Sequence, residues 1–135
     1  MPDSLKWLAA LLVGAILAAP ASLYVQRLET EHRGRIIAAQ LTGGDPDAGR
    51  AAVSRYGCPS CHQFSGARGV AGQVGPSLTG MASRPVIAAR LPNDPSDLIR
   101  WVRFPQEVSP GCGMPDLAVN ERDGRDIAAY LYTLQ

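Results

Sequence analysis

The chain contains the pentapeptide Cys58-Pro59-Ser60-Cys61-His62, in which two residues separate the cysteines and a histidine follows the second cysteine directly. This order is the attachment pattern of c-type haem. Two thiols at this spacing can add to the two vinyl groups of one porphyrin, and the adjacent imidazole can supply a nitrogen ligand to the iron. The pentapeptide therefore predicts one covalently attached haem c.

Two other chemistries use the same residue types and stay open as alternatives. A C-x-x-C pair can act as a redox dithiol, although no strand-helix-strand pattern flanks this pair. Cys58, Cys61, His62 and Cys112 could together bind zinc through three sulfurs and one nitrogen. Structural zinc sites usually include a second cysteine pair, however, and Cys112 stands alone in the sequence.

The composition of the chain agrees with a bound group inside a small domain. Its 135 residues include 14 glycines and 11 prolines but only two Phe, two Trp and four Tyr. A small chain with few large core residues needs a disulfide, a metal or a cofactor for stability, and three cysteines cannot build a disulfide framework. The formal net charge of +1 removes the usual electrostatic basis of nucleic-acid binding.

An uncharged apolar run of twenty residues extends from Trp7 to Gln26. As a helix it would be about 30 Å long, which is enough to cross a bilayer. Trp7 and Tyr24 stand near its two ends, where amphipathic rings favour the membrane interface. The run predicts a membrane-spanning helix. The alternative is a signal peptide that is cleaved at the small residues 19–21.

We expect three parts along the chain. Residues 1–26 form a transmembrane anchor, or an uncleaved signal sequence, and residues 27–44 form a juxtamembrane stalk that ends in a glycine hinge. Residues 45–135 form a domain that carries nine Arg and nine Asp or Glu residues but no Lys. Its protein charges therefore balance, and long-range electrostatic steering of partners should be weak.

Three helices are expected in this last part. The first follows an N-cap at Asp45 and stops at Gly57, the second follows Asp94 and stops before Pro105, and the third follows Asn120. The long segment between the first and last helices is rich in glycine and proline, and no strand pattern in it is convincing. The expected fold class is all-α.

Further ordered motifs flank the pentapeptide: a helix from Gly49 to Tyr56 before it, then Val74-Gly75-Pro76-Ser77-Leu78, the helix after Asp94-Pro95, Gly113-Met114-Pro115 and the closing stretch Asp126–Leu131. Together, over residues 45–135, these motifs resemble the class I cytochromes c, small monohaem electron carriers with His/Met ligation. The resemblance implies the class I cytochrome c fold, with few helices and long loops around one covalent haem. It also implies that the first and last helices cross, with Gly49 packed against Tyr130.

The resemblance implies specific ligands for the haem iron. His62 is the implied proximal ligand and Met114 the implied axial ligand on the opposite face, with Met81 as the rival sulfur. Pro76 supplies the carbonyl that accepts a hydrogen bond from the His62 ring. Leu78 is expected to pack against the haem, as are Leu98, Val102 and Leu117.

Other residues are expected around the haem or close to its ligands. Trp101 is implied near the propionates, and an arginine could pair with them; the candidates are Arg84, Arg90, Arg100 and Arg103. Cys112 is expected to be an inert loop residue. An intermolecular disulfide, a lipid-modified thiol or competition for the iron are its alternatives.

The resemblance implies electron transfer rather than catalysis. Two protein ligands on the iron leave no open position for a substrate, so we expect a one-electron carrier and not an enzyme. It would act as a tethered shuttle or as a subunit of a respiratory or photosynthetic complex. The expected partners are redox proteins (an oxidase, a quinol-oxidising complex, a reaction centre or a dehydrogenase) and the membrane, but no nucleic acid.

The resemblance also implies a location. Haem attachment in this family takes place on the outer side of the bacterial inner membrane. We therefore expect a single-pass protein of that membrane with its haem domain in the periplasm. The alternative functions are a haem subunit of a periplasmic dehydrogenase and a redox or gas sensor that works through loss of Met114.

Overall fold

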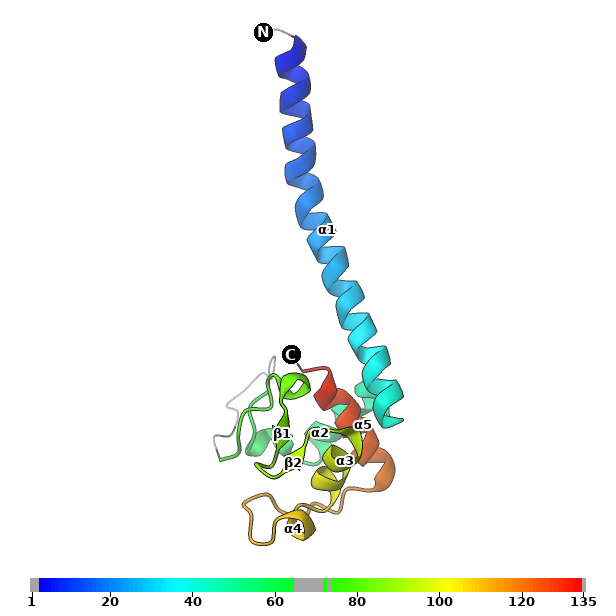
Figure 1. The fold of residues 1–135 in the computed structure, drawn as a ribbon, viewed down its shortest axis with the longest axis vertical. Helices are drawn as coiled ribbons and strands as arrows, with labels where there is room; N and C mark the ends of the chain where they lie inside the picture. The colour runs from blue at the N-terminus through cyan, green and yellow to red at the C-terminus, as the bar shows by residue number, and fades with distance from the viewer. Residues whose placement is uncertain (1–2, 65–71, 73, 135) are drawn as a thin grey trace. The chain divides into compact units, whose positions relative to one another are not determined.

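The structure, a computed structural model, describes residues 3–64, 72 and 74–134. Residues 65–71 and 73, in the expected long looped segment, lie outside the described residues. The chain is mostly helical (Figure 1). Its elements in order are α1 (Asp3–Thr42), α2 (Pro46–Arg55), the 3-10 turns η1 (Cys58–Ser60) and η2 (Met81–Ser83), β1 (Val86–Ile87), β2 (Leu91–Pro92), α3 (Pro95–Arg103), α4 (Pro105–Val108) and α5 (Glu121–Tyr132). The chain divides into two compact units, Met1–Arg33 and Gly34–Gln135.

Among the residues that the structure describes, the first unit consists of helix α1 up to Arg33, which includes its apolar stretch. A window of 18 residues in α1 has a mean hydropathy of 2.1, and none of it is buried. By length and composition α1 can cross a membrane, and a signal sequence would meet the same criterion. The prediction of a long apolar helix near the N-terminus is confirmed. Its retention as an anchor stays a prediction.

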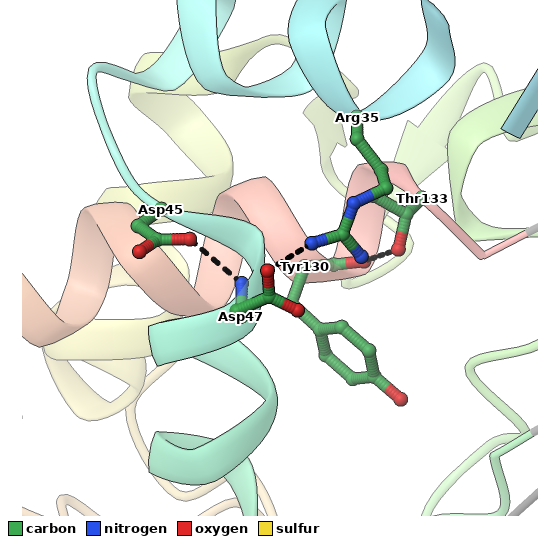
Figure 2. Close-up of polar contacts among 5 residues, drawn as sticks. All are labelled: Arg35, Asp45, Asp47, Tyr130 and Thr133. Carbon is green, nitrogen blue, oxygen red and sulfur yellow. Dashed lines mark hydrogen bonds and ion pairs between the residues drawn. The ribbon is translucent and has the colours of Figure 1, made fainter. Parts of the chain in front are cut away.

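The second unit starts with the end of α1, which stops at the predicted glycine pair. Gly43 has a φ of 66°, and its N–H donates to the Ala39 carbonyl at 2.9 Å, so it ends the helix in the left-handed conformation that glycine favours. Arg35 forms an ion pair with Asp47, which links the end of α1 to the first turn of α2 (Figure 2). The expected boundaries of the anchor at residue 26 and of the stalk at residue 44 stay predictions.

The predicted helix caps are confirmed. The side chain of Asp45 accepts a hydrogen bond from the Asp47 N–H at 2.8 Å (Figure 2), and Asp94 accepts one from Asp97 at 2.9 Å. Asn120 accepts one from the Asp123 N–H at 2.9 Å. Each cap satisfies a donor that the first helical turn leaves without a partner, and this fixes where α2, α3 and α5 begin.

Helices α2 and α5 cross in close contact, as predicted. A Cβ atom on Gly49 would overlap the carbonyl oxygen of Asp126 and would lie 2.9 Å from the Tyr130 Cβ. The ring of Tyr130 stacks on Phe64 with 6.4 Å between the centroids. Helix α3 also packs against α5 (Figure 1). The core between these helices consists of buried apolar side chains, among them Ala52, Val53, Leu98, Val102, Ile127, Ala128 and Leu131.

The contact between α2 and α5 also contains a polar group. Asp126 is 6% exposed, and its carboxylate accepts a hydrogen bond from the Asp45 N–H at 2.7 Å. At the other end of α2, Asp123 accepts hydrogen bonds from the Tyr56 hydroxyl and from Asn120, and it pairs with Arg55. These contacts, with the Tyr56 hydrogen bond first, lower the pKa of the Asp123 carboxyl. The two helices are therefore fixed at both ends of their contact.

The middle of the domain contains a short hairpin, which corrects the expectation of no strands. β1 and β2 pair antiparallel, with Ile87 opposite Leu91. Strands of two residues are too short to show alternation of apolar and polar positions. The turn contains Ala88 and Ala89, both with positive φ, where glycine or asparagine is the usual signal. The sequence therefore gave no indication of a hairpin at this place.

Helix α3 ends at Arg103, as the proline after it predicted, but Pro105 also begins α4. A proline fits the first position of a helix because the N–H that it lacks would have no helical partner there. Pro105 is among the fully buried side chains, so it fixes this short helix in the core.

We predict that Gly49→Ala lowers the free energy of unfolding by about 1–3 kcal/mol or more, because α2 must move away from the Asp126 carbonyl. Chemical denaturation followed by circular dichroism measures this change. Gly34→Ala is the matched control, since a Cβ there meets nothing within 4 Å and alanine favours a helix by up to about 1 kcal/mol. Equal stability of the Gly49 variant and the unmodified protein would contradict the close crossing.

Candidate functional site

A cavity of about 640 Å³ lies in the second unit, within the size range of cofactor sites. Its lining comes from the pentapeptide region, from the segments around residues 74–78 and 81–89, from α3 and from the loop that follows α4. The lining includes these residues predicted for the site: Cys58, Cys61, His62, Pro76, Leu78, Trp101 and Met114. The structure therefore brings together residues that are up to 56 positions apart in the chain.

The pentapeptide forms a tight turn directly after α2. Gly57 has a φ of 72°, which begins the 3-10 turn η1, and the His62 N–H donates to the Cys58 carbonyl at 3.0 Å. Cys58 and Cys61 are free, half-buried thiols that line the cavity. Burial raises the pKa of the Cys58 thiol, which favours its neutral form.

The ring of His62 has a defined orientation. Its Nδ1 lies 2.8 Å from the carbonyl oxygen of Pro76, the contact that the resemblance implies. A carbonyl only accepts, so Nδ1 donates the proton of this hydrogen bond, and in the neutral ring Nε2 keeps a free lone pair. Gly75 lies against the same ring, because a Cβ there would be 2.5 Å from the His62 Cε1. His62 thus has the tautomer of a nitrogen ligand. Its role as an iron ligand stays a prediction.

Backbone hydrogen bonds attach the segment around Pro76 to the pentapeptide. The Gly75 N–H donates to the Cys61 carbonyl at 2.8 Å, and the Leu78 N–H donates to the Gln63 carbonyl at 2.8 Å. Gly72 donates to the Pro59 carbonyl at 3.0 Å. The acceptor of the His62 proton is therefore fixed to the same turn that carries the histidine.

Both candidate sulfur ligands line the cavity. Met81 is buried with 5% of its surface exposed, whereas Met114 is half-buried in the loop after α4. Of the other apolar residues expected at the haem, Leu117 also lines the cavity. Among the residues that the structure describes, Leu98 and Val102 do not line it and belong to the helical core instead.

The structure distinguishes among the candidate arginines. Arg84 lines the cavity and donates to the carbonyl oxygens of Ser77 and Thr79. Arg100 and Arg103 line a separate hollow beside the start of α3. Among the described lining residues, Arg84 is therefore the candidate arginine that lies at the cavity.

Sequence reasoning missed two parts of the site. The hairpin turn contributes Ile87, Ala88 and Ala89 to the lining, and an Ala-Ala turn gives no sequence signal. Gln106 contacts the loop that carries Met114, and a lone glutamine after a proline has no motif that would reveal this.

The described residues contain no group of three or more His, Cys, Asp or Glu side chains placed to hold a metal ion. This arrangement gives no support to a zinc site that combines Cys112 with the pentapeptide. The cavity lining contains the side chains of Cys58, Cys61 and Cys112, the His62 imidazole and the thioethers of Met81 and Met114, around a mainly apolar space.

Comparison with known proteins gives one distant similarity. Cytochrome c oxidase subunit 2 of Alkalihalophilus pseudofirmus is 34% identical to this chain over 88 residues. The match covers 64% of this chain and 25% of the relative, so the chain spans about a quarter of the length of the curated relative that it matches. No protein-family model matches the chain. No solved structure matches it.

We predict that Gly75→Ala lowers the free energy of unfolding by about 1–3 kcal/mol, because the new methyl group displaces the His62 ring from Pro76. The midpoint of chemical denaturation measures this loss. Gly113→Ala is the matched control, since Gly113 lines the same cavity but a Cβ there meets nothing within 4 Å. Equal losses in the two variants would contradict the contact between Gly75 and His62.

Proposed function

We propose that this chain is a one-electron carrier with a single covalent haem c in the domain of residues 45–135. The observation that carries the proposal is the cavity, which collects both pentapeptide thiols, the His62 imidazole and the Met114 side chain around an apolar space. The expected class I cytochrome c fold is part of this proposal. The similarity to an oxidase subunit also supports a role in electron transfer, because that protein belongs by its name to a respiratory electron-transfer enzyme.

The residues present fit the haem. Each of the thiols of Cys58 and Cys61 would add its sulfur and its hydrogen across one vinyl double bond, which forms a thioether and needs no oxidant. His62 presents the lone pair of Nε2 while Pro76 keeps the proton on Nδ1. Bound haem supplies an iron that alternates between Fe(II) and Fe(III).

The remaining lining residues would control the environment of the iron. Leu78 and Leu117 exclude water, and Trp101 would donate its indole N–H near the propionates. Arg84 supplies the positive charge at the cavity. With His62 and Met114 as ligands no coordination position is free for a substrate, and electron transfer is the chemistry that remains.

The cellular setting follows from helix α1 and the similarity. We infer that α1 is a retained single-pass anchor in the bacterial inner membrane, with the haem domain in the periplasm. The name of the relative favours a cytochrome c oxidase as the partner, either as a complex that contains this chain or as its electron acceptor. A quinol-oxidising complex, a reaction centre or a dehydrogenase would be the other outcomes of a partner search.

We predict that a haem-stained denaturing gel shows the chain in salt-washed membranes at its full mass of 14.3 kDa plus one haem. The host must be a strain that matures c-type cytochromes. The double variant Cys58→Ser, Cys61→Ser should lose the band, because no thioether can form. Cys112→Ser is the matched control and should keep it.

The gel separates the parts of the proposal. A shorter haem band in the periplasmic fraction would show that α1 is a cleaved signal sequence, and the covalent haem would stand. Absence of a band for the unmodified chain in both fractions would contradict the haem itself. Loss of the band in Cys112→Ser as well would point to a site that needs all three cysteines.

We predict that Met114→Leu abolishes the long-wavelength absorbance band of a ferric thioether–iron bond and lowers the reduction potential, because thioether ligation raises this potential. Met81→Leu should leave both unchanged, since leucine has nearly the volume of methionine and preserves the packing. Spectroscopy and redox titration of both variants measure the effect. If Met81→Leu abolished the band and lowered the potential while Met114→Leu left both unchanged, Met81 would be the ligand.

A further inference from the structure

Gln106, in the short helix α4, makes hydrogen bonds to three positions in the loop that carries Met114. Its Nε2 donates to the Met114 carbonyl at 2.6 Å and to the Cys112 carbonyl at 3.0 Å. Its Oε1 accepts from the Gly111 N–H at 3.0 Å. The Cys112 Sγ also lies 3.3 Å from this Nε2. A side-chain amide has two donor hydrogens, so both are used on acceptors of the two residues that flank Gly113.

The loop itself has few other connections. Among the described residues from 111 to 117, the backbone–backbone bond within the loop is Cys112 N–H to the Ser109 carbonyl at 3.1 Å. Gly111 has a φ of 78°, and a Cβ on Gly113 would meet nothing within 4 Å. Ordering such a segment costs conformational entropy that its own contacts hardly offset. The Cys112 Sγ adds longer contacts to the carbonyls of Pro105 and Met114, at 3.7 and 3.6 Å. The Gln106 amide therefore makes the shorter of these hydrogen bonds to Met114, at 2.6 Å.

Gln106 itself stands on a rigid support. Pro105 precedes it and is fully buried, and the Ser109 N–H donates to the Pro105 carbonyl at 2.9 Å, which closes α4. Gln106 is half-buried, so its hydrogen bonds are partly shielded from competition with water.

We propose that Gln106 is a positioning residue for Met114: its amide holds the loop closed, so that the Met114 sulfur stays at the iron. The inference rests on the proposed function, in which Met114 is the axial ligand. Without the amide, the loop opens more often and the sulfur leaves the iron. A small external ligand then binds more tightly, in proportion to the open fraction.

The experiment uses the full-length holoprotein in its ferric state and imidazole as the competing ligand. Gln106→Met removes all the hydrogen bonds at similar volume, and Gln106→Glu keeps the Oε1 acceptor but loses both donors. We expect both variants to bind imidazole about tenfold more tightly, or better, than the unmodified protein, because two hydrogen bonds of ordinary strength are lost. Loss of the thioether–iron band upon imidazole addition gives the binding curve.

Asn93→Leu is the matched control. Asn93 holds another loop at the same cavity, since its Nδ2 donates to the Met81 and Arg84 carbonyls at 2.8 Å and its Oδ1 accepts from the Tyr132 hydroxyl at 3.1 Å. This variant loses a similar set of hydrogen bonds and some thermal stability. Its imidazole affinity should stay within about twofold of the unmodified protein.

The outcomes separate the two proposals. A thioether–iron band in the unmodified protein together with unchanged imidazole affinity in Gln106→Met would overturn the role of Gln106 alone. An equal increase in Asn93→Leu would show that general loosening, rather than Gln106, exposes the iron. Absence of a thioether–iron band in the unmodified protein would overturn the ligand assignment on which the inference rests.

Discussion

The close approach of α2 to α5 at Gly49 is the constraint on which the rest of the domain depends. Helix α2 leads directly into the turn of Cys58 and Cys61, so a shift of α2 would carry both thiols with it. The missing side chain at Gly49 allows the Asp126 carbonyl to lie against the α2 backbone. The buried Asp126 carboxylate then holds the first residue before α2 through its N–H. Packing and polar contacts thus fix the same helix.

The walls of the cavity depend on single side chains instead of regular secondary structure. Asn93 joins η2 to the end of α5 through Tyr132, and Gln106 joins α4 to the Met114 loop. The Pro76 carbonyl joins the segment before Leu78 to His62. Loops of this kind bury little apolar surface. A large group that binds to the folded domain and not to the unfolded chain would stabilise it by mass action.

The helices could be predicted from the sequence because their signals are local. Asp45, Asp94 and Asn120 act as caps within three residues of themselves. The contact of Gly49 with Tyr130 was instead implied by the resemblance to a known family. The alanine turn of the hairpin could not be predicted, because alanine rarely adopts the positive φ values that this turn has. The role of Gln106 could not be predicted for a related reason. Its role exists only once the following loop folds back onto α4.

The charge distribution of the domain bears on how it would meet a partner. Residues 45–135 contain equal numbers of Arg and acidic residues, and several of them are paired internally, such as Arg55 with Asp123 and Arg125 with Glu121. A balanced surface gives little long-range attraction to a charged partner. A chain held at the membrane by α1 has less need of such attraction, because tethering raises the effective concentration of partners in the same membrane. A neutral domain and an apolar helix therefore both suit a protein that meets its partners while tethered to the same membrane.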